Sequence, residues 1–208
     1  LAWDLHTARL ARGCQALGLP KPPLADLHQD ALQLVGTQDG PGVLKLMLTT
    51  RGGERGYARP APVAWRRIVS LTPAPAWPAE EYEQGIAVRW CRQLWSPMPR
   101  LAGIKHLNRL TQVLARAEWH DPGIAEGLLR DPSGAVIGAT MSNLFLVRDG
   151  VLFTPAIGAC GIAGTLRARI LACAGDLGIP VRETVLTVLD CHRADELLLC
   201  NAVRGVRP

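Results

Sequence analysis

Lysine is rare in this chain, and one lysine stands in a context suited to amine chemistry. Lysine and arginine together number 23, yet the lysines are only Lys21, Lys45 and Lys105. Arginine keeps its charge, whereas a desolvated lysine can lose its proton and act as a nucleophile, a base or a Schiff-base former. Lys105 lies between the apolar run 101–104 and an amphipathic segment that begins at Asn108. It is therefore the candidate catalytic residue; the alternative is a boundary lysine whose stem covers apolar surface.

A glycine-bearing loop further along the chain has the features of an anion site. Gly158, Gly161 and Gly164 lead into a predicted helix from Thr165 to about Leu177. A loop that feeds a helix in this way presents free backbone N–H groups and the positive end of the helix dipole. The glycine spacing is unspecific, so an ordinary strand-to-helix turn is the alternative interpretation.

Several motifs together point to one protein family. Residues 103–109 read GIKHLNR and resemble the lysine segment of the fold-type IV pyridoxal-phosphate enzymes, most closely that of the aminodeoxychorismate lyases. The other matching segments follow in the family's order, namely residues 42–45, 55–57, 126–129, 142–145, 154–155 and 160–167. Each motif is weak alone, but the ordered set covers nearly the whole chain.

The resemblance implies a two-domain α/β (α+β) fold like that of D-amino acid aminotransferase. We expect a small N-terminal domain over residues 1–72 and a larger cofactor-binding domain over 79–208. The proline-dense stretch 73–78 is the predicted linker. Compared with the family pattern, we expect that the first hairpin and the last helix lie outside this chain.

The resemblance also implies the cofactor, pyridoxal 5'-phosphate, held as a Schiff base on Lys105. Arg9 lies in the sequence HTARL and matches a family arginine that reaches the cofactor phosphate; a surface helix arginine is the alternative. The remaining implied phosphate contacts are the amides of Thr165 and Leu166, the Thr165 hydroxyl, Asn201 and Ala202.

Three residues are implied in substrate binding. Arg55 and Tyr57 follow a glycine-rich stretch and would face a substrate carboxylate, although that stretch also fits a flexible turn. Arg109 lies four residues after Lys105, so that it is either a site-facing residue or a solvated helix arginine.

The implied reaction is the conversion of 4-amino-4-deoxychorismate into 4-aminobenzoate and pyruvate, a step of folate biosynthesis, with Lys105 as the base. Relatives carry a glutamate beside the pyridine nitrogen, where this chain has Gly138. Without that carboxylate we expect a poorer electron sink and impaired activity. The alternatives are an aminotransferase of the D-amino acid or branched-chain kind, and a non-catalytic relative that binds a phosphorylated ligand. The family implies a homodimer.

The bulk composition limits the other classes. Hydrophobic residues make up 48% and charged residues 20% of the chain, and no apolar run or leader pattern predicts a membrane span or export. The net charge of +5 comes from scattered arginines, which favours a small anionic substrate over nucleic acid. The six cysteines form no CxxC pair, so we expect reduced thiols, a cytoplasmic location and no metal site.

The hydrophobic periodicity predicts the elements that must position these residues. Helices are expected over 5–17, 24–35, from 108, 165–177 and 190–196. Strands are expected over 43–49, around 68, and over 86–91, 126–130, 135–140, 144–148, 151–154, 181–189 and 197–203. The spacing of Leu107, Leu110, Val113 and Leu114 predicts a buried helix face.

Overall fold

A computed structural model describes residues 2–52 and 55–208, which form two compact units. The larger unit comprises Leu1–Arg9 and Trp77–Pro208, and the smaller unit comprises Leu10–Ala76. The boundary at Ala76 falls within the proline-dense stretch, and the first nine residues group with the larger unit. Helix α1 (Trp3–Ala16) therefore contributes its first turns to the larger unit.

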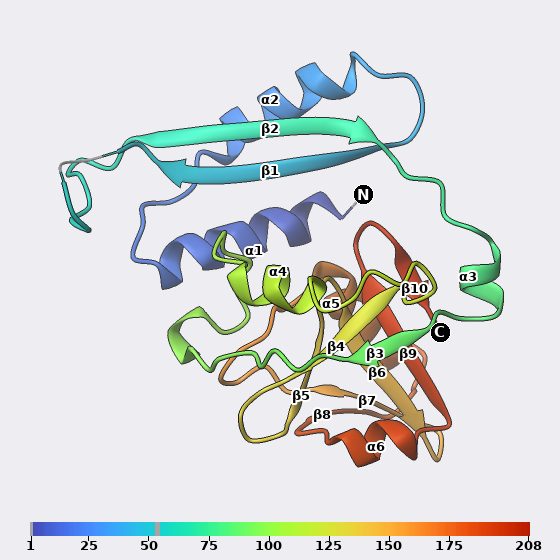
Figure 1. The fold of residues 1–208 in the computed structure, drawn as a ribbon. Coiled ribbons are helices and arrows are strands. Elements are labelled where there is room, and N and C mark those ends of the chain that lie inside the picture. The colour runs from blue at the N-terminus through green and yellow to red at the C-terminus, as the bar shows by residue number, and fades with distance from the viewer. Residues whose placement is uncertain (1, 53–54) are drawn as a thin grey trace. The chain divides into compact units, whose positions relative to one another are not determined.

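The smaller unit contains a long hairpin covered by one helix. Strands β1 (Gly42–Thr50) and β2 (Trp65–Pro73) pair antiparallel along their full length, and α2 (Leu24–Val35) lies along them (Figure 1). Leu27 and Ala31 give α2 its buried face. On the outside, Arg67 of β2 forms ion pairs with Asp26 and Asp30 of α2, at 2.8 and 2.7 Å.

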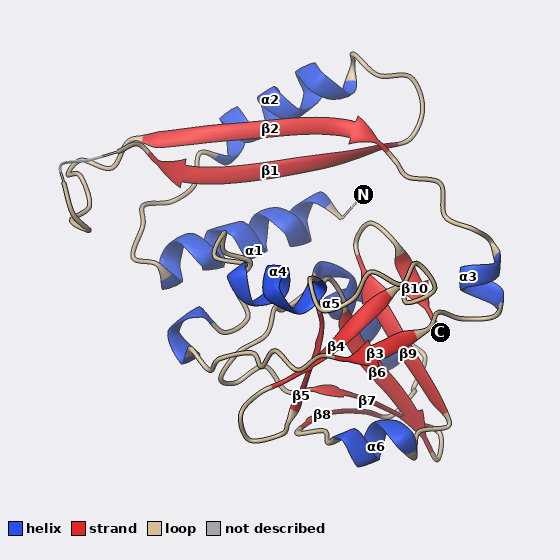
Figure 2. Ribbon diagram, in the orientation of Figure 1, coloured by secondary structure: helices blue, strands red, loops and turns tan. Residues whose placement is uncertain are grey.

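The larger unit is built on two sheets (Figure 2). The three-stranded sheet consists of β3 (Val88–Trp90), β4 (Glu126–Arg130) and β5 (Val136–Ala139). The five-stranded sheet has the order β10-β9-β6-β7-β8, with β6 at Asn143–Arg148, β7 at Val151–Pro155, β8 at Val181–Thr184, β9 at Glu196–Asn201 and β10 at Gly205–Arg207. Strands β7 and β8 are parallel, and α5 (Thr165–Asp176) is the crossover between them.

The alternation of side chains along β6 produces two cores. Leu144 and Leu146 pack with Leu128 of the three-stranded sheet, so one core lies between the sheets. Phe145 points to the opposite face and packs with Ala174 of α5. The second core therefore holds α5 against the five-stranded sheet.

Short helices complete the larger unit: α3 (Glu80–Glu83), the 3₁₀ turn η1 (Pro99–Leu101), α4 (Leu110–Arg116) and α6 (Val188–His192). Helix α6 corrects the predicted strand 181–189, which ends at Thr184. Thr187 and Asp190 form a reciprocal capping box, and this local arrangement starts a helix inside an apolar run that is typical of a strand.

The predicted buried face of α4 is wrong. Leu110 and Val113 are 62% and 61% exposed, and Leu107 and Leu114 are exposed as well. Gln112 and Ala115 face inward instead, where Ala115 packs with Trp119. Periodicity marks an apolar stripe but does not tell what covers it. Within the described residues, no helix combines the length and the apolarity needed to cross a membrane.

Candidate active site

The start of α5 has the uncapped backbone that the predicted anion cup requires. Gly164 is its N-cap residue, and in the described part of the chain no side chain caps this first turn. Asn143 holds the preceding loop, because its Nδ2 donates a 2.8 Å hydrogen bond to the carbonyl of Ile162. A Cβ at Gly164 would collide with Oδ1 of Asn143. The backbone N–H groups of Thr165 and Leu166 therefore stand at an open helix N-terminus.

A buried arginine anchors this helix to the sheet. Arg167, in the first turn of α5, is 6% exposed. Its Nη2 donates to the carbonyl of Pro155 at 3.0 Å and to Glu183 at 2.5 Å. These contacts tie the helix start to the end of β7 and to β8, so the cup has a fixed orientation.

His6 connects the cup to Arg9. The Nη2 of Arg9 lies 3.4 Å from Nδ1 of His6, and Nε2 of His6 lies 3.3 Å from the Thr165 hydroxyl. Arginine is always a donor, so Nδ1 accepts and the Nε2–H donates to Thr165. This arrangement leaves the hydroxyl proton of Thr165 for an anion. Burial lowers the pKa of His6 most, followed by the charges of Arg9 and Lys105.

Lys105 is held beside the same cup. Gly103 forms a bridge with Ile162, in which its N–H donates to Gly161 and its carbonyl accepts from Ala163, at 3.0 and 2.9 Å. The side chain of Lys105 is exposed, and its charge acts on His6. The bridge thus places the backbone of the lysine segment against the loop that precedes α5.

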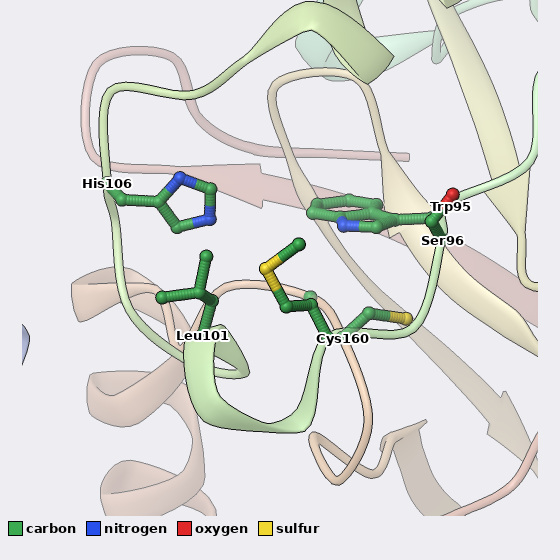
Figure 3. Close-up of a pocket in the computed structure, with 7 residues that line it drawn as sticks. Trp95, Ser96, Leu101, His106 and Cys160 are labelled. Carbon is green, nitrogen blue, oxygen red and sulfur yellow. The ribbon is translucent and has the colours of Figure 1, made fainter. Parts of the chain in front are cut away.

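His106, the next residue, enters a small pocket. This pocket of about 20 Å³ has room for roughly one water molecule. Figure 3 shows the rings of His106 and Trp95 facing each other across it, with Leu101 alongside. Among the described residues, Nδ1 of His106 is buried without a hydrogen-bond partner. Burial raises the pKa of the neighbouring Cys160 thiol to about 11, so this thiol is not a nucleophile near neutral pH.

Asn201 and Ala202 lie at the end of β9, next to Asn143, which pairs with Cys200. The Asn201 amide is engaged internally: Nδ2 donates to Ser142 at 3.2 Å, and Oδ1 accepts from Val203 and Arg204. The side chain thus shapes the turn, and Ala202 is the exposed residue of the pair. Their contact with phosphate remains a prediction.

Behind this turn lies a fully buried carboxylate. Glu126 is 0% exposed and accepts hydrogen bonds from the Thr140 hydroxyl, the Met141 amide and the Ser142 hydroxyl. Because Ser142 also contacts Asn201, Glu126 supports both the loop after β5 and the turn after β9.

Gly138, where the family resemblance predicts a glutamate, adopts a backbone conformation that side chains rarely accept. Its φ is +152°, and a Cβ would lie 3.1 Å from the carbonyl oxygen of Ser142. The conformation of this strand is thus adapted to glycine.

The expected substrate residues belong to different units. Arg55 and Tyr57 belong to the smaller unit and are exposed, and residues 53–54 of the same predicted loop lie outside the described residues. Arg109 belongs to the larger unit and folds back on the lysine segment, where Nε donates to the carbonyl of His106 at 2.9 Å. Their substrate contacts remain predictions.

Sequence reasoning did not assign His6, Asn143 or Glu126 to the site. His6 lies three residues before Arg9, on the same side of a helix, which is a usable signal. Asn143 and Glu126 lie in two of the matching segments, but their contacts could not be predicted because their partners are distant in sequence. No group of three or more histidine, cysteine or acidic side chains in the described residues could hold a metal.

Known proteins resemble the whole chain. Residues 1–208 match the family described as amino-transferase class IV. An aminodeoxychorismate lyase of Vibrio harveyi is 31% identical over 206 residues, which cover 99% of this chain and 76% of that protein. The crystal structure of 4-amino-4-deoxychorismate lyase from Pseudomonas aeruginosa is 44% identical and superposes with a TM-score of 0.93, covering 99% of this chain and 75% of that one.

A second group of relatives is less similar. The branched-chain-amino-acid aminotransferase of Escherichia coli is 35% identical, but only over 133 residues, or 62% of this chain and 43% of that protein. A structure of the Escherichia coli branched-chain amino acid aminotransferase superposes with a TM-score of 0.84 at 25% identity, over 99% of this chain and 69% of that one. Together with the lysine, the anion cup and the two-sheet core, these matches establish that the chain belongs to the class IV aminotransferase family, which has the fold-type IV architecture.

Proposed function

We propose that this protein is a pyridoxal-phosphate-dependent aminodeoxychorismate lyase that converts 4-amino-4-deoxychorismate into 4-aminobenzoate and pyruvate. The observation that carries the proposal is the bridge between Gly103 and Ile162, which joins the lysine segment to the anion cup within one unit. The lyase crystal structure is 44% identical over 99% of the chain, whereas the branched-chain aminotransferase structure is 25% identical over the same share. This difference in identity favours the lyase over an aminotransferase.

The donor set fits the two ends of the cofactor. Lys105 supplies a primary amine for an aldehyde, and the first turn of α5 supplies backbone N–H groups for a phosphate dianion. Arg9, His6 and the Thr165 hydroxyl lie on the same side of the cup. A guanidinium fork, two amides and a hydroxyl match the acceptors of a phosphate. Asn201 and Ala202 complete the proposed shell.

When bound, pyridoxal phosphate condenses with amines and withdraws electrons from the carbon that bears the nitrogen. Lys105 then holds and moves the proton at that carbon of the substrate. Cleavage of the C–O bond to the ring then releases the enolpyruvyl group as pyruvate and leaves an aromatic ring, which favours the forward reaction. We assign Arg55 and Tyr57 to the substrate side as proposals, whereas Arg109 is either a substrate residue or a residue that supports the lysine segment.

Gly138 limits this chemistry. A carboxylate beside a pyridine nitrogen stabilises its protonated form, and glycine offers none. We propose that the lyase turns over slowly for this reason. Aromatisation of the product supplies driving force that a transamination lacks, so a lyase tolerates the loss better than an aminotransferase does.

We further propose a cytoplasmic homodimer. All six cysteines, each within the described part of the chain, are free thiols, as in a reducing compartment. The exposed stripe of Leu107, Leu110, Val113 and Leu114 is the surface that a second copy would cover. We also propose that the two units act as domains, with the cofactor held in the larger one.

Pyruvate release tests the function. Wild-type protein loaded with pyridoxal phosphate is incubated with 4-amino-4-deoxychorismate, with and without a 2-oxo acid. We expect equal amounts of pyruvate and 4-aminobenzoate without any 2-oxo acid. Lys105→Ala should lower the rate at least about a hundredfold, whereas Lys21→Ala should not change it. Amino transfer that needs a 2-oxo acid would identify an aminotransferase, and absence of both products would refute the lyase.

A further inference from the structure

Arg109 contacts the backbone on both sides of the catalytic lysine. Its Nε donates to the carbonyl of His106 at 2.9 Å, and its Nη2 donates to the carbonyl of Ile104 in a longer contact of 3.4 Å. Ile104 and His106 are the residues immediately before and after Lys105. Arg109 itself is the N-cap residue of α4, so one guanidinium connects the helix start to the lysine segment.

The side chains on both sides of Lys105 are also held in place. Ile104 is buried, at 6% exposed, and His106 enters the pocket beside Cys160 (Figure 3). Lys105 between them is exposed. The two neighbours of Lys105 are thus fixed by packing and their two carbonyls by Arg109, while Lys105 itself is exposed.

Two carbonyls held at once require a particular kind of donor. A guanidinium is planar and presents several N–H groups in a fixed fork, whereas a lysine ammonium is a single point on a flexible stem. Arg109 is partly buried, and burial lowers its pKa from the ordinary value. A desolvated cation is retained where its hydrogen bonds compensate for lost water, and here those bonds go to the two carbonyls.

We propose that Arg109 is a positioning residue that fixes the backbone of Lys105, so that its amine meets the aldehyde of a cofactor whose phosphate lies in the cup of α5. This inference rests on the proposed function and refines it. It assigns to Arg109 a role that does not require contact with the substrate. Displacement of a reacting group by about 1 Å is sufficient to lower a rate a hundredfold.

The test compares Arg109→Lys, which keeps the charge but loses the fork, with Arg109→Met, which keeps only an apolar stem. Arg193→Lys, at an exposed arginine after α6, is the matched control. For each apoprotein we measure the Kd of pyridoxal phosphate and, separately, the Kd of inorganic phosphate. Pyridoxal phosphate followed by borohydride then labels lysines, and mass spectrometry gives the label at Lys105 relative to Lys21 and Lys45.

We expect both Arg109 variants to bind pyridoxal phosphate at least about tenfold more weakly, with less label at Lys105 and an unchanged Kd for inorganic phosphate. Wild-type affinity and labelling in Arg109→Lys would overturn the proposal, because charge alone would then suffice. Wild-type cofactor affinity in both variants with a raised KM would also overturn it and would place Arg109 on the substrate. Circular dichroism checks that each variant is folded. If Arg109→Met is unfolded, the result for Arg109→Lys alone decides the test.

These readouts are independent of the lyase reaction. If the wild-type protein takes up label at Lys105 but releases no pyruvate, the proposed function fails while the positioning role stands. If pyruvate is released and labelling is insensitive to Arg109, only the positioning role fails.

Discussion

The hydroxyl of Thr165 lies 3.3 Å from Nε2 of His6, although 159 positions separate the two residues in sequence. Through this contact the first turns of α1 reach the open N-terminus of α5. His6 also accepts a hydrogen bond from Arg9. The Arg9 guanidinium, the His6 imidazole and the Thr165 hydroxyl therefore form a chain of contacts at the anion cup. The protonation state of His6 therefore links the folded structure of the site to pH.

The first prediction concerns this link. The pKa of His6 is lowered from its ordinary value of 6.5 by burial and by the charges of Arg9 and Lys105. As the pH falls below 6.5, His6 gains a proton in the unfolded chain while it is still neutral in the folded chain. The free energy of unfolding therefore falls as the pH decreases from 6.5 towards the folded pKa. Above pH 6.5 His6 is neutral in both states, and its contribution to stability is fully present. Chemical unfolding of the apoprotein between about pH 7.5 and about pH 5 measures the slope.

His6→Gln should flatten this pH dependence, because glutamine can still accept from Arg9 and donate to Thr165 but does not titrate. His106 also has a lowered pKa, owing to burial and Arg109, so His106→Gln is the comparison that separates the two histidines. An unchanged slope in His6→Gln would contradict the link.

The second prediction concerns the cup. Gly164→Ala places a methyl group against Oδ1 of Asn143, so the loop must shift and the first-turn amides with it. Loss of one or two charge-assisted hydrogen bonds of about 1.5–3 kcal/mol each should raise the Kd of inorganic phosphate roughly tenfold or more. Gly175→Ala, in the same helix with no described atom within 4 Å of its added Cβ, should leave that Kd unchanged. Isothermal titration calorimetry distinguishes these outcomes; equal affinities in both variants would show that the anion binds elsewhere.

The lysine segment and the proposed cup could be predicted from the sequence because each is defined by residues that are close together in the chain. The cup needs a glycine loop and a helix start, and both lie within residues 158–166. The lysine segment is short and has its own motif. The bounds of α2 and β4 agree with the expected residues, since each has a regular apolar period and a clear turn after it.

The remaining features depend on contacts that no local pattern records. Glu126 reads as an ordinary polar residue at a strand start, and only folding places it under Thr140 and Ser142. The stripe on α4 has the period of a buried face, yet Ala115 is the residue by which α4 joins the core cluster, which also contains Cys91, Trp119 and Leu129. The role of Arg109 could not be predicted for the same reason. Its partners are backbone carbonyls, which every residue has, so the sequence does not mark them.

The third prediction separates strain from charge at Gly138. Its φ of +152° and the 3.1 Å approach of the Ser142 carbonyl mean that any side chain there is strained. Gly138→Ala introduces the strain alone, at about 1–3 kcal/mol, and should lower the melting temperature without raising turnover. Gly138→Glu adds a carboxylate for the pyridine nitrogen. Its lyase turnover should exceed that of Gly138→Ala by at least about tenfold. Equal turnover in the two variants would contradict the proposed role of the missing carboxylate.

The fourth prediction concerns the exposed stripe on α4. Leu110 and Val113 present apolar side chains to solvent, and burial of each against a second copy would contribute roughly 1.5–3 kcal/mol. Leu110→Glu places a charge in that surface, so the Kd of self-association should rise at least about tenfold. Leu177→Glu, at an exposed leucine after α5, is the matched control and should leave it unchanged. Sedimentation velocity over a concentration series measures both, and a dimer that persists in Leu110→Glu with wild-type affinity would locate the dimer surface elsewhere.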